Sequence, residues 1–388
     1  MAALDLESAR ETFESSTDFT VGLEEEFAIV DPETLELEHR YEDVKAACDR
    51  DEVLAEAAAG ELIASEIEIR SGRSETFADA VAAQQERRDR LFGLVDGMGL
   101  ALAATGTHPW ADYLDQRIID TPHYNRLEDE LGWVAQRNNT WSLHVHMGVR
   151  GADRAIAVCD RLRELLPVLL AASANSPFLD RRDTGLHTVR TEIFTRTFPR
   201  CGIPNAWGTW QAYEDFVRVL ERTGTAIEST QLWWSVRPHH AFGTVEVRIC
   251  DAQTRGDEST TLAGLIAACV AQTALAYDEH GYDGAGGPLA DREIEENLWR
   301  AIKHGIGGEM IDFRDGATLV GSREMLERLL AWTEPARSQL GIEVDLPERN
   351  GAERSLAALG DGASIEEVYR EAVTETKATY TADIGSPR

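Results

Sequence analysis

The chain has 388 residues, 43% of them hydrophobic, which is enough to bury a substantial core and excludes global disorder. It carries 69 acidic residues against 38 basic ones, for a formal net charge of −31. A polyanion of this size is repelled by phosphate backbones and anionic lipid headgroups, so neither nucleic acid nor a membrane surface is expected as a partner.

The composition also bears on habitat and compartment. Only three of the basic residues are lysines, which favours a protein from a high-salt cytoplasm over an acidic mesophilic protein. The first twenty residues are acidic and lack the apolar run of a signal peptide. The five cysteines are scattered and form no C-x-x-C pair, which fits reduced thiols. We therefore expect a halophilic, cytoplasmic protein.

Strand and helix patterns alternate along the whole chain without a repeat or linker, which predicts one α+β domain over residues 1–388, with flexible ends at 1–17 and 380–388. In chain order we predict a strand at 20–30, a strand at 62–70, a helix at 74–104, a strand at 141–149, a helix at 153–174, a strand at 244–250, and helices at 258–277, 291–304, 323–332 and from the capping box at Ser364.

Two segments of this pattern could be mistaken for functional elements. The apolar run 262–277 is interrupted by Gln272 and Thr273 and is short for a membrane span, so we predict a buried helix. The glycine-rich stretch 281–288 has no lysine and no preceding apolar strand, so it indicates a flexible loop and not a phosphate-binding loop.

Four of the predicted strands carry ionisable residues at every second position, so these side chains share one face of each strand. The pairs are Glu24 with Glu26, Glu66 with Glu68, His144 with His146, and Glu246 with Arg248. Aliphatic residues mainly occupy the opposite faces. A solvated sheet face is the simpler interpretation. Such a face usually mixes Lys, Thr, Ser and Glu, whereas these strands carry mainly Glu, His and Arg.

If the four polar faces converge, their charges need partners. Two carboxylates about 4 Å apart repel each other by about 4 kcal/mol at an effective dielectric constant of about 20, so a cluster must take up protons or bind cations. Oxygen ligands with an occasional imidazole suit Mg²⁺ or Mn²⁺ better than zinc. Arg248, two residues from Glu246, is a suitable contact for a phosphate bridging to the metal. This predicts a site for a metal-bound nucleotide.

Six segments together point to a known family. They are TVGLEEEFAIVDPET (20–34), ATGTHPWADY (104–113), SLHVHMGV (142–149), LLAASANSPFLDRRDTGLHTVRTEIF (169–194), WWSVRPHHAFGTVEVRICD (233–251) and NLWRAIKHGIGG (297–308). In this order they resemble the glutamate–cysteine ligase type 2 family of ATP-dependent carboxylate–amine ligases, and its haloarchaeal members in particular. The stretch SGRSETF (71–77) departs from many relatives, which bears on local contacts to the amino-acid substrate.

The resemblance implies a glutamine-synthetase-like fold: a curved antiparallel sheet with helices on its convex face, and ATP with two or three Mg²⁺ ions on its concave face. It also implies a reaction in which ATP phosphorylates the γ-carboxylate of glutamate. The amine of cysteine then displaces the phosphate, giving γ-glutamylcysteine, ADP and phosphate. The implied partners are these small molecules, and the oligomeric state stays open.

Roles for individual residues follow from the same resemblance. The implied metal ligands are Glu24, Glu26, Glu61, Glu68, His144 and Glu246, with Glu61 the weaker match. Glu66 has no counterpart. Arg248 is an implied phosphate contact, Arg190 an implied contact of substrate carboxylate, and Arg126 a second carboxylate or phosphate contact. His146 is a candidate for removing the amine proton, with a packing role equally open.

Other conspicuous residues have plainer interpretations. Trp233 and Trp234 are expected to pack in the core or at a strand edge and not to hold a nucleobase. Cys250 is expected to be a small buried residue, and His239 and His240 to shape a turn after Pro238. His108 could either close the site from a loop or pack.

Three alternatives remain at this point. A γ-glutamyl ligase with another amine acceptor is the nearest, because the activated carboxylate is better defined than the acceptor. A metal-dependent hydrolase and a non-catalytic sensor of a metal or nucleotide are the others. The combination of Glu246, Arg248 and Arg190 argues against these two, because hydrolysis needs no separate clamps for phosphate and amino acid.

Overall fold

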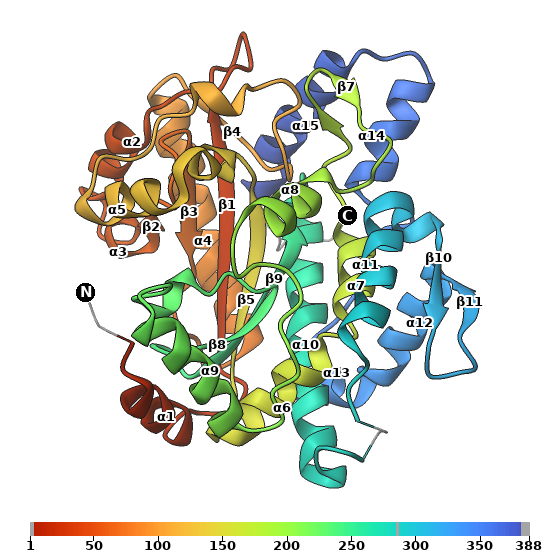
Figure 1. The fold of residues 1–388 in the computed structure, drawn as a ribbon. Coiled ribbons are helices and arrows are strands. Elements are labelled where there is room, and N and C mark those ends of the chain that lie inside the picture. Colours follow the sequence, from red (N-terminus) through yellow and green to blue (C-terminus); the bar gives the residue numbers. More distant parts are fainter. Residues whose placement is uncertain (1–3, 285–286, 382–388) are drawn as a thin grey trace.

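A seven-stranded antiparallel sheet forms the centre of the protein in the computed structural model, which describes residues 4–284 and 287–381 (Figure 1). The strand order is β2–β3–β1–β5–β9–β8, and β4 pairs with residues 28–30 of β1 on the edge opposite β3, past the end of the β1–β5 pairing. The strands are β1 (Val21–Val30), β2 (Ala58–Ala59), β3 (Glu66–Arg70), β4 (Ala101–Ala103), β5 (Ser142–Gly148), β8 (Val236–His239) and β9 (Thr244–Asp251). Two small hairpins lie apart from this sheet: β6 (Phe178–Leu179) with β7 (Arg182–Asp183), and β10 (Glu309–Asp312) with β11 (Thr318–Gly321).

Helices account for most of the remaining regular structure. The α-helices are α1 (Leu6–Glu14), α2 (Tyr41–Cys48), α3 (Leu54–Ala57), α4 (Phe77–Gly97), α5 (Pro122–Leu131), α6 (Ala152–Leu162), α7 (Leu166–Ser173), α8 (Val189–Thr197), α9 (Trp210–Arg222), α10 (Gly256–His280), α11 (Asp291–His304), α12 (Ser322–Trp332), α13 (Glu334–Leu340), α14 (Gly351–Gly360) and α15 (Ile365–Tyr380). Short 3₁₀ helices are η1 (Tyr113–Asp115), η2 (Gly132–Asn138), η3 (Ser229–Gln231) and η4 (Gly305–Gly307).

The aliphatic face of the sheet lies on a layer of helices. Leu23, Val145 and Val247 belong to one buried cluster together with α6, α7 and α10, and Phe27 and Ile67 belong to a second cluster with α4 and α15. Burial of this apolar face is what stabilises the sheet and leaves its other face for polar residues. The expected α+β fold, with helices on one face of an antiparallel sheet, is confirmed.

Helix α10 is the core helix of this layer. Among the described residues it alone is long and apolar enough to cross a membrane by length and composition, yet 72% of its most apolar window is buried inside the fold. Leu265, Ile266 and Val270 are fully buried in the first cluster. The prediction of a buried helix here is confirmed.

Two predicted helices are divided in the structure. The helix predicted at 74–104 ends at Gly97, because Gly99 takes a positive φ of 72° that turns the chain back into β4. The helix predicted at 153–174 is two helices, α6 and α7. Pro167, in the first turn of α7, has no N–H to continue the ladder from α6. The other predicted helices and the four strands agree with the structure within a few residues.

The predicted flexible N-terminus is wrong for residues 6–14. Helix α1 begins after Asp5, whose side chain accepts a hydrogen bond from the backbone N–H of Ser8, and it buries Phe13 against Trp210 with ring centroids 5.5 Å apart. At the other end Tyr380 is buried and its hydroxyl donates to the Gln253 carbonyl over 2.7 Å, while residues 382–388 lie outside the described part. The predicted loop 281–288 includes residues 285–286, which also lie outside it.

Candidate active site

The strand register aligns the polar residues in one row across the sheet. Glu26 lies opposite Glu68 of β3, and Glu24 lies opposite His144 of β5. His146 in turn lies opposite Glu246 of β9. Directly opposed residues of an antiparallel pair project to the same face, with their Cβ atoms about 5 Å apart. The four polar pairs predicted from the sequence therefore do meet on one face.

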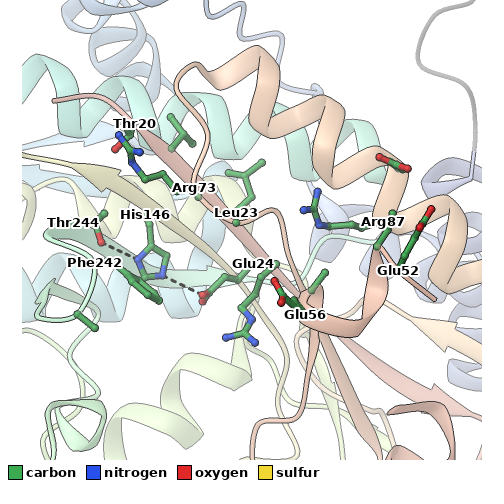
Figure 2. A pocket seen from close by; sticks show the side chains of 18 residues that line it. Thr20, Leu23, Glu24, Glu52, Glu56, Arg73, Arg87, His146, Phe242 and Thr244 are labelled. Carbon is green, nitrogen blue, oxygen red and sulfur yellow. Dashed lines mark hydrogen bonds and ion pairs between the residues drawn. The ribbon is translucent and has the colours of Figure 1, made fainter. Parts of the chain in front are cut away.

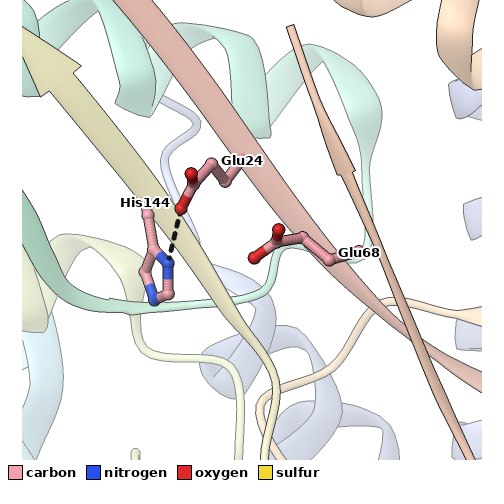
Figure 3. A group of neighbouring side chains, drawn as sticks. All are labelled: Glu24, Glu68 and His144. Atoms are coloured by element: carbon pink, nitrogen blue, oxygen red, sulfur yellow. Dashed lines mark hydrogen bonds and ion pairs between the residues drawn. The ribbon is translucent and has the colours of Figure 1, made fainter. Parts of the chain in front are cut away.

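Three groups in this row have ligand atoms within 4.8 Å of one another: Glu26 with Glu61 and Glu68, Glu24 with Glu68 and His144, and Glu24 with His146 and Glu246. Figure 3 shows the second group, with Glu24 reaching from β1 between the side chains of its neighbouring strands. Glu61, which precedes β3, joins the row through the loop after β2. The structure thus brings together all six residues implied as metal ligands.

The carboxylates at the β3 end are buried with too few partners. Burial and the neighbouring Glu61 raise the pKa of Glu26 to about 7. Burial and the nearby Glu24 and Glu61 raise the pKa of Glu68 well above its ordinary value, and burial and Glu26 do the same for Glu66. One oxygen of Glu68 and both oxygens of Glu66 have no hydrogen-bond donor. A cluster of carboxyl groups that takes up protons when no cation is bound has the hard oxygen ligands of a site for Mg²⁺.

The two histidines of β5 have different environments. Burial and Arg248 lower the pKa of His144 to about 4, so its ring is neutral, the form that binds metal. Its Nδ1 lies 3.3 Å from Glu24 and its Nε2 lies 2.7 Å from the Ser142 hydroxyl. For His146, burial acts against protonation, but the Glu24 and Glu246 carboxylates raise its pKa above the ordinary value. Its Nδ1 lies 3.0 Å from the Thr244 hydroxyl.

Arginines close the other end of the row. Nε of Arg237 donates to one oxygen of Glu246 over 2.6 Å and Nη2 to the other over 3.2 Å, while Nη1 of Arg248 also contacts this carboxylate. Although burial opposes ionisation, Arg237 and Arg248 hold the pKa of Glu246 well below its ordinary value. Glu246 is therefore a fixed anion.

Arg237 is a site residue to which the sequence analysis gave no role. It lies opposite Glu246 in the β8–β9 hairpin, and its Nη1 is anchored on the Leu232 carbonyl over 2.7 Å. The signal that could have found it is the hairpin itself. A strand either side of the turn at 240–243 would have placed residues 237 and 246 on one face.

Two cavities adjoin this row. We call the first the Arg248 cavity: it has a volume of about 390 Å³ and is lined by Glu61, Glu68, Tyr124, Trp233, Glu246 and Arg248, among others. We call the second the Arg73 cavity: it measures about 750 Å³ and is lined by Thr20, Gly22, Arg70, Gly72, Arg73, Arg87 and Thr244, among others (Figure 2). Glu24, Arg70, His146, Ala241 and Phe242 line both cavities. Glu24 and His146 of the row thus lie where the two cavities meet, whereas Glu61, Glu68 and Glu246 line the Arg248 cavity only.

The two remaining predicted arginines are placed differently. Arg190 is buried beside β9, where its guanidinium donates to the carbonyls of Ile249 and Arg248 over 3.2 and 3.3 Å. It lines a small third cavity of about 10 Å³ together with Arg248. Arg126 is exposed on α5 and lines a separate cavity of about 660 Å³, which shares His123 and Leu127 with the Arg248 cavity. The structure therefore does not bring Arg126 to the carboxylate row.

His108 is a packing residue and not part of the site. Its Nε2 lies 2.7 Å from the Leu35 carbonyl, and its Nδ1 accepts from the backbone N–H of Ala111 over 3.0 Å. Its ring packs on Trp110 and Tyr369, with centroids 4.7 Å away in each case.

The remaining conspicuous residues mostly fit their plain interpretations. Trp234 and Cys250 are buried in the core, as expected. His240 lies 2.7 Å from the Tyr213 hydroxyl, beside the turn that follows Pro238. Trp233 differs, because it lines the Arg248 cavity.

Comparison with known proteins identifies the family. The sequence of residues 20–357 matches the family model of glutamate-cysteine ligase family 2 (GCS2). A relative from Rubrobacter xylanophilus with the provisional name glutamate–cysteine ligase 2-2 is 37% identical over 375 residues, covering 96% of this chain and 95% of the relative. A second relative, from Sorangium cellulosum, has the provisional name glutamate–cysteine ligase 2. It is 35% identical, and the match covers 92% of this chain and 96% of the relative.

Solved structures agree on the fold. A bifunctional glutathione synthetase from Pasteurella multocida superposes with a TM-score of 0.66 over 96% of this chain and 54% of that one, at 13% identity. A glutamate–cysteine ligase from Francisella tularensis in complex with AMP superposes with a TM-score of 0.64 over 96% of this chain and 91% of that one, at 10% identity. Identities this low bear on the fold alone. Taken with the family match over most of its length, they leave one assignment: the chain belongs to glutamate-cysteine ligase family 2 and is a ligase.

Proposed function

We propose that the protein is an ATP- and Mg²⁺-dependent glutamate–cysteine ligase that forms γ-glutamylcysteine, ADP and phosphate. The observation that carries this proposal is the row of side chains along the Arg248 cavity, which has carboxylates at one end and the Arg237–Glu246–Arg248 cluster at the other. The row reaches the Arg73 cavity through Glu24 and His146. Such a row provides carboxylate ligands for metal cations and, beside them, the Arg248 guanidinium as a contact for phosphate. A phosphoryl transfer between two small substrates needs both.

Each cavity has a proposed occupant. The Arg73 cavity, at about 750 Å³, is the larger and takes the nucleotide, while the Arg248 cavity, at about 390 Å³, takes the two amino acids. Glu26, Glu61 and Glu68 would hold one Mg²⁺, and Glu24 would bind a further ion with Glu68 and His144 on one side or with Glu246 on the other. When bound, these ions supply neutralisation of the phosphate charge, and Mn²⁺ would suit the same oxygen-rich ligands.

The reaction consists of two displacements. An oxygen of the glutamate γ-carboxylate attacks the terminal phosphorus of ATP, and the bond to the leaving ADP breaks. The neutral amine of cysteine then attacks the resulting acyl phosphate, forming the amide and releasing phosphate. Arg248 stabilises charge on the transferred group. His146, which faces both cavities, is the proposed group for holding the proton that the amine loses.

A second candidate acceptor comes from the cavity walls. Leu127, Phe198 and Trp233 give the Arg248 cavity an apolar side that would accept a side chain other than that of cysteine. A γ-glutamyl ligase with a different amine is therefore the alternative activity of the same site.

The test is a phosphate-release assay in molar KCl with ATP, Mg²⁺ and glutamate, adding one amine at a time. We expect cysteine to stimulate release and mass spectrometry to detect γ-glutamylcysteine. Stimulation by another amine alone would transfer the assignment to the alternative. Release without any amine and without an amide product would indicate a hydrolase and contradict both.

A further inference from the structure

Phe242 is an aromatic side chain left 56% exposed at the junction of the two cavities. It lies in the turn between β8 and β9, and Figure 2 shows it beside His146. One face of its ring stacks on His239, with centroids 4.3 Å apart and planes 14° from parallel. Its edge contact with His146 has a centroid distance of 5.7 Å. The ring is thus supported on one side and open on the other.

The turn that carries Phe242 is held in place. The backbone N–H groups of Phe242 and Gly243 donate to the His239 carbonyl over 3.3 and 3.0 Å. The Ser16 hydroxyl, which follows α1, donates to the Gly243 carbonyl over 2.8 Å. Gly243 has a positive φ of 61°, and a Cβ there would lie 2.9 Å from the Thr12 carbonyl oxygen. This turn therefore presents the ring in a fixed orientation, which lowers the entropic cost of binding.

The position of Phe242 relative to the carboxylate row fits a nucleotide. His146, next to Phe242, lies 3.4 Å from Glu24 and 3.8 Å from Glu246. A nucleotide whose phosphates lie at these groups has its sugar and base farther along the Arg73 cavity. Gly22 and Ala241, which have little or no side chain, line this cavity together with Phe242.

We propose that Phe242 is the stacking platform for the nucleobase, and this inference rests on the proposed function. A phenyl ring stacks on any flat base, because every base has a π-face. It offers no hydrogen bond to the base edge. Phe242 therefore contributes affinity for a nucleotide over bare polyphosphate, without selecting among purines.

The test compares two ligands that differ only in the nucleoside: Mg–ATP and Mg–tripolyphosphate, measured by calorimetry in molar KCl without amino-acid substrates. We expect Phe242→Leu to weaken ATP binding about tenfold or more and to leave tripolyphosphate binding unchanged, because only the stacking face is lost. Phe242→Trp, which keeps an aromatic face, should bind ATP as the wild type does. The matched control is Trp233→Leu, which removes an aromatic from the Arg248 cavity and should leave ATP affinity unchanged.

Three results would overturn the inference: unchanged ATP affinity in Phe242→Leu, equal weakening of both ligands in that variant, or an equal loss of ATP affinity in Phe242→Leu and Trp233→Leu. A wild-type protein that binds neither ligand would instead refute the proposed function, and the platform with it. The wild-type measurement distinguishes the two failures. Unchanged tripolyphosphate binding by Phe242→Leu shows that its loss of ATP affinity is not a folding defect, and recovery in Phe242→Trp ties the loss to the aromatic face.

Discussion

Glu24 and Glu25 are neighbours in the chain that lie on opposite faces of β1 and belong to two different environments. Glu24 points into the carboxylate row, where its oxygens face His144 and His146. Glu25 is buried on the helical face, where it pairs with Arg88 of α4 and accepts hydrogen bonds from Gln84 and Ser259. Alternation along the strand separates a site residue from a structural one by a single position.

The proposed function predicts that Glu24→Gln and Glu246→Gln abolish turnover without unfolding the protein. Each change removes an anion from the row while keeping the size of the side chain. Glu246→Gln also leaves Arg237 without its buried carboxylate, so the melting temperature of this variant should fall although it stays folded at the assay temperature. Phosphate release measures the first effect, and the melting temperature measures the second. Near-normal activity in both variants would refute the assignment of these residues to the metal site.

The matched variant Glu25→Gln should behave in the opposite way. It leaves the Arg88 guanidinium buried without its carboxylate, which costs about 3–5 kcal/mol of unfolding free energy. At a temperature where the variant stays folded, its activity should remain close to that of the wild type. Urea unfolding and phosphate release check the two parts. A stable but inactive Glu25→Gln protein would show that this side chain takes part in the reaction.

The raised pKa values of Glu26 and Glu68 predict how pH affects the metal-free protein. The ordinary pKa of a glutamate is 4.5 and that of Glu26 is about 7, so the folded state binds more protons than the unfolded state between these values. The free energy of unfolding should therefore fall as pH rises from 5 to 8. Mg²⁺ should raise the melting temperature at pH 8 and have little effect at pH 5, because its ligands must be ionised.

The control for this pH effect is the double variant Glu26→Gln, Glu68→Gln, measured with EDTA or Mg²⁺ at constant KCl. It should lose most of the stabilisation by Mg²⁺ and only part of the pH dependence, because burial also raises the pKa of Glu66, which the variant keeps. If Mg²⁺ raised the melting temperature of the wild type equally at pH 5 and pH 8, this would contradict the proposed ligand set.

At the scale of elements, helix α1 packs against parts of the fold that are distant in sequence. Phe13 is fully buried and contacts Trp210 of α9, and Ser16 holds the turn after β8. An acidic N-terminal segment can therefore still be part of the core when one helix face carries Leu6, Ala9 and Phe13.

Phe13→Ala should destabilise the protein by about 3–5 kcal/mol, the usual cost of the cavity left by a buried phenyl ring. Urea unfolding measures this loss. The exposed Trp133, replaced by Ala, is the control and should change stability little. A loss below about 1 kcal/mol for Phe13→Ala would mean that α1 contributes little to the folded state.

At the scale of the whole molecule, the negative charge has two distributions. Within the described residues eight acidic side chains are buried: Glu25, Glu26, Glu66, Glu68, Asp160, Glu246, Asp251 and Glu258. Six of these lie on β1, β3 and β9. Most of the other acids of the chain form a solvated surface, whose mutual repulsion opposes folding when it is not screened.

This surface predicts a strong dependence of stability on salt, as we propose for a protein from a high-salt cytoplasm. Raising KCl from about 0.1 M to about 1 M shortens the screening length from about 10 Å to about 3 Å. The melting temperature should therefore rise over this range. Sucrose at equal osmolality is the control, because it stabilises proteins through exclusion of the solute from the protein surface and does not screen charge. An equal rise in melting temperature in sucrose would contradict a screening effect.

The alternation of residues along the strands determined, from sequence alone, which side chains share a face. This worked for Glu24, Glu26, Glu68, His144 and Glu246 because a period of two is a local property of extended backbone. The family resemblance added Glu61 and the ligase assignment. Gly99 and Pro167 are helix-breaking residues that can be recognised in the sequence, although the predicted helices 74–104 and 153–174 ran through them.

Tertiary structure alone decided the rest. Four features depend on contacts between segments that are distant in the chain. They are the pairing of Arg237 with Glu246, the burial of Arg190 beside β9, the position of Arg126 on a separate cavity and the packing of His108. The stacked ring of Phe242 depends on a hairpin turn that Ser16, in the segment after α1, holds by a hydrogen bond. Strand order and helix docking set these contacts, and neither is encoded in the spacing of residues within a single segment.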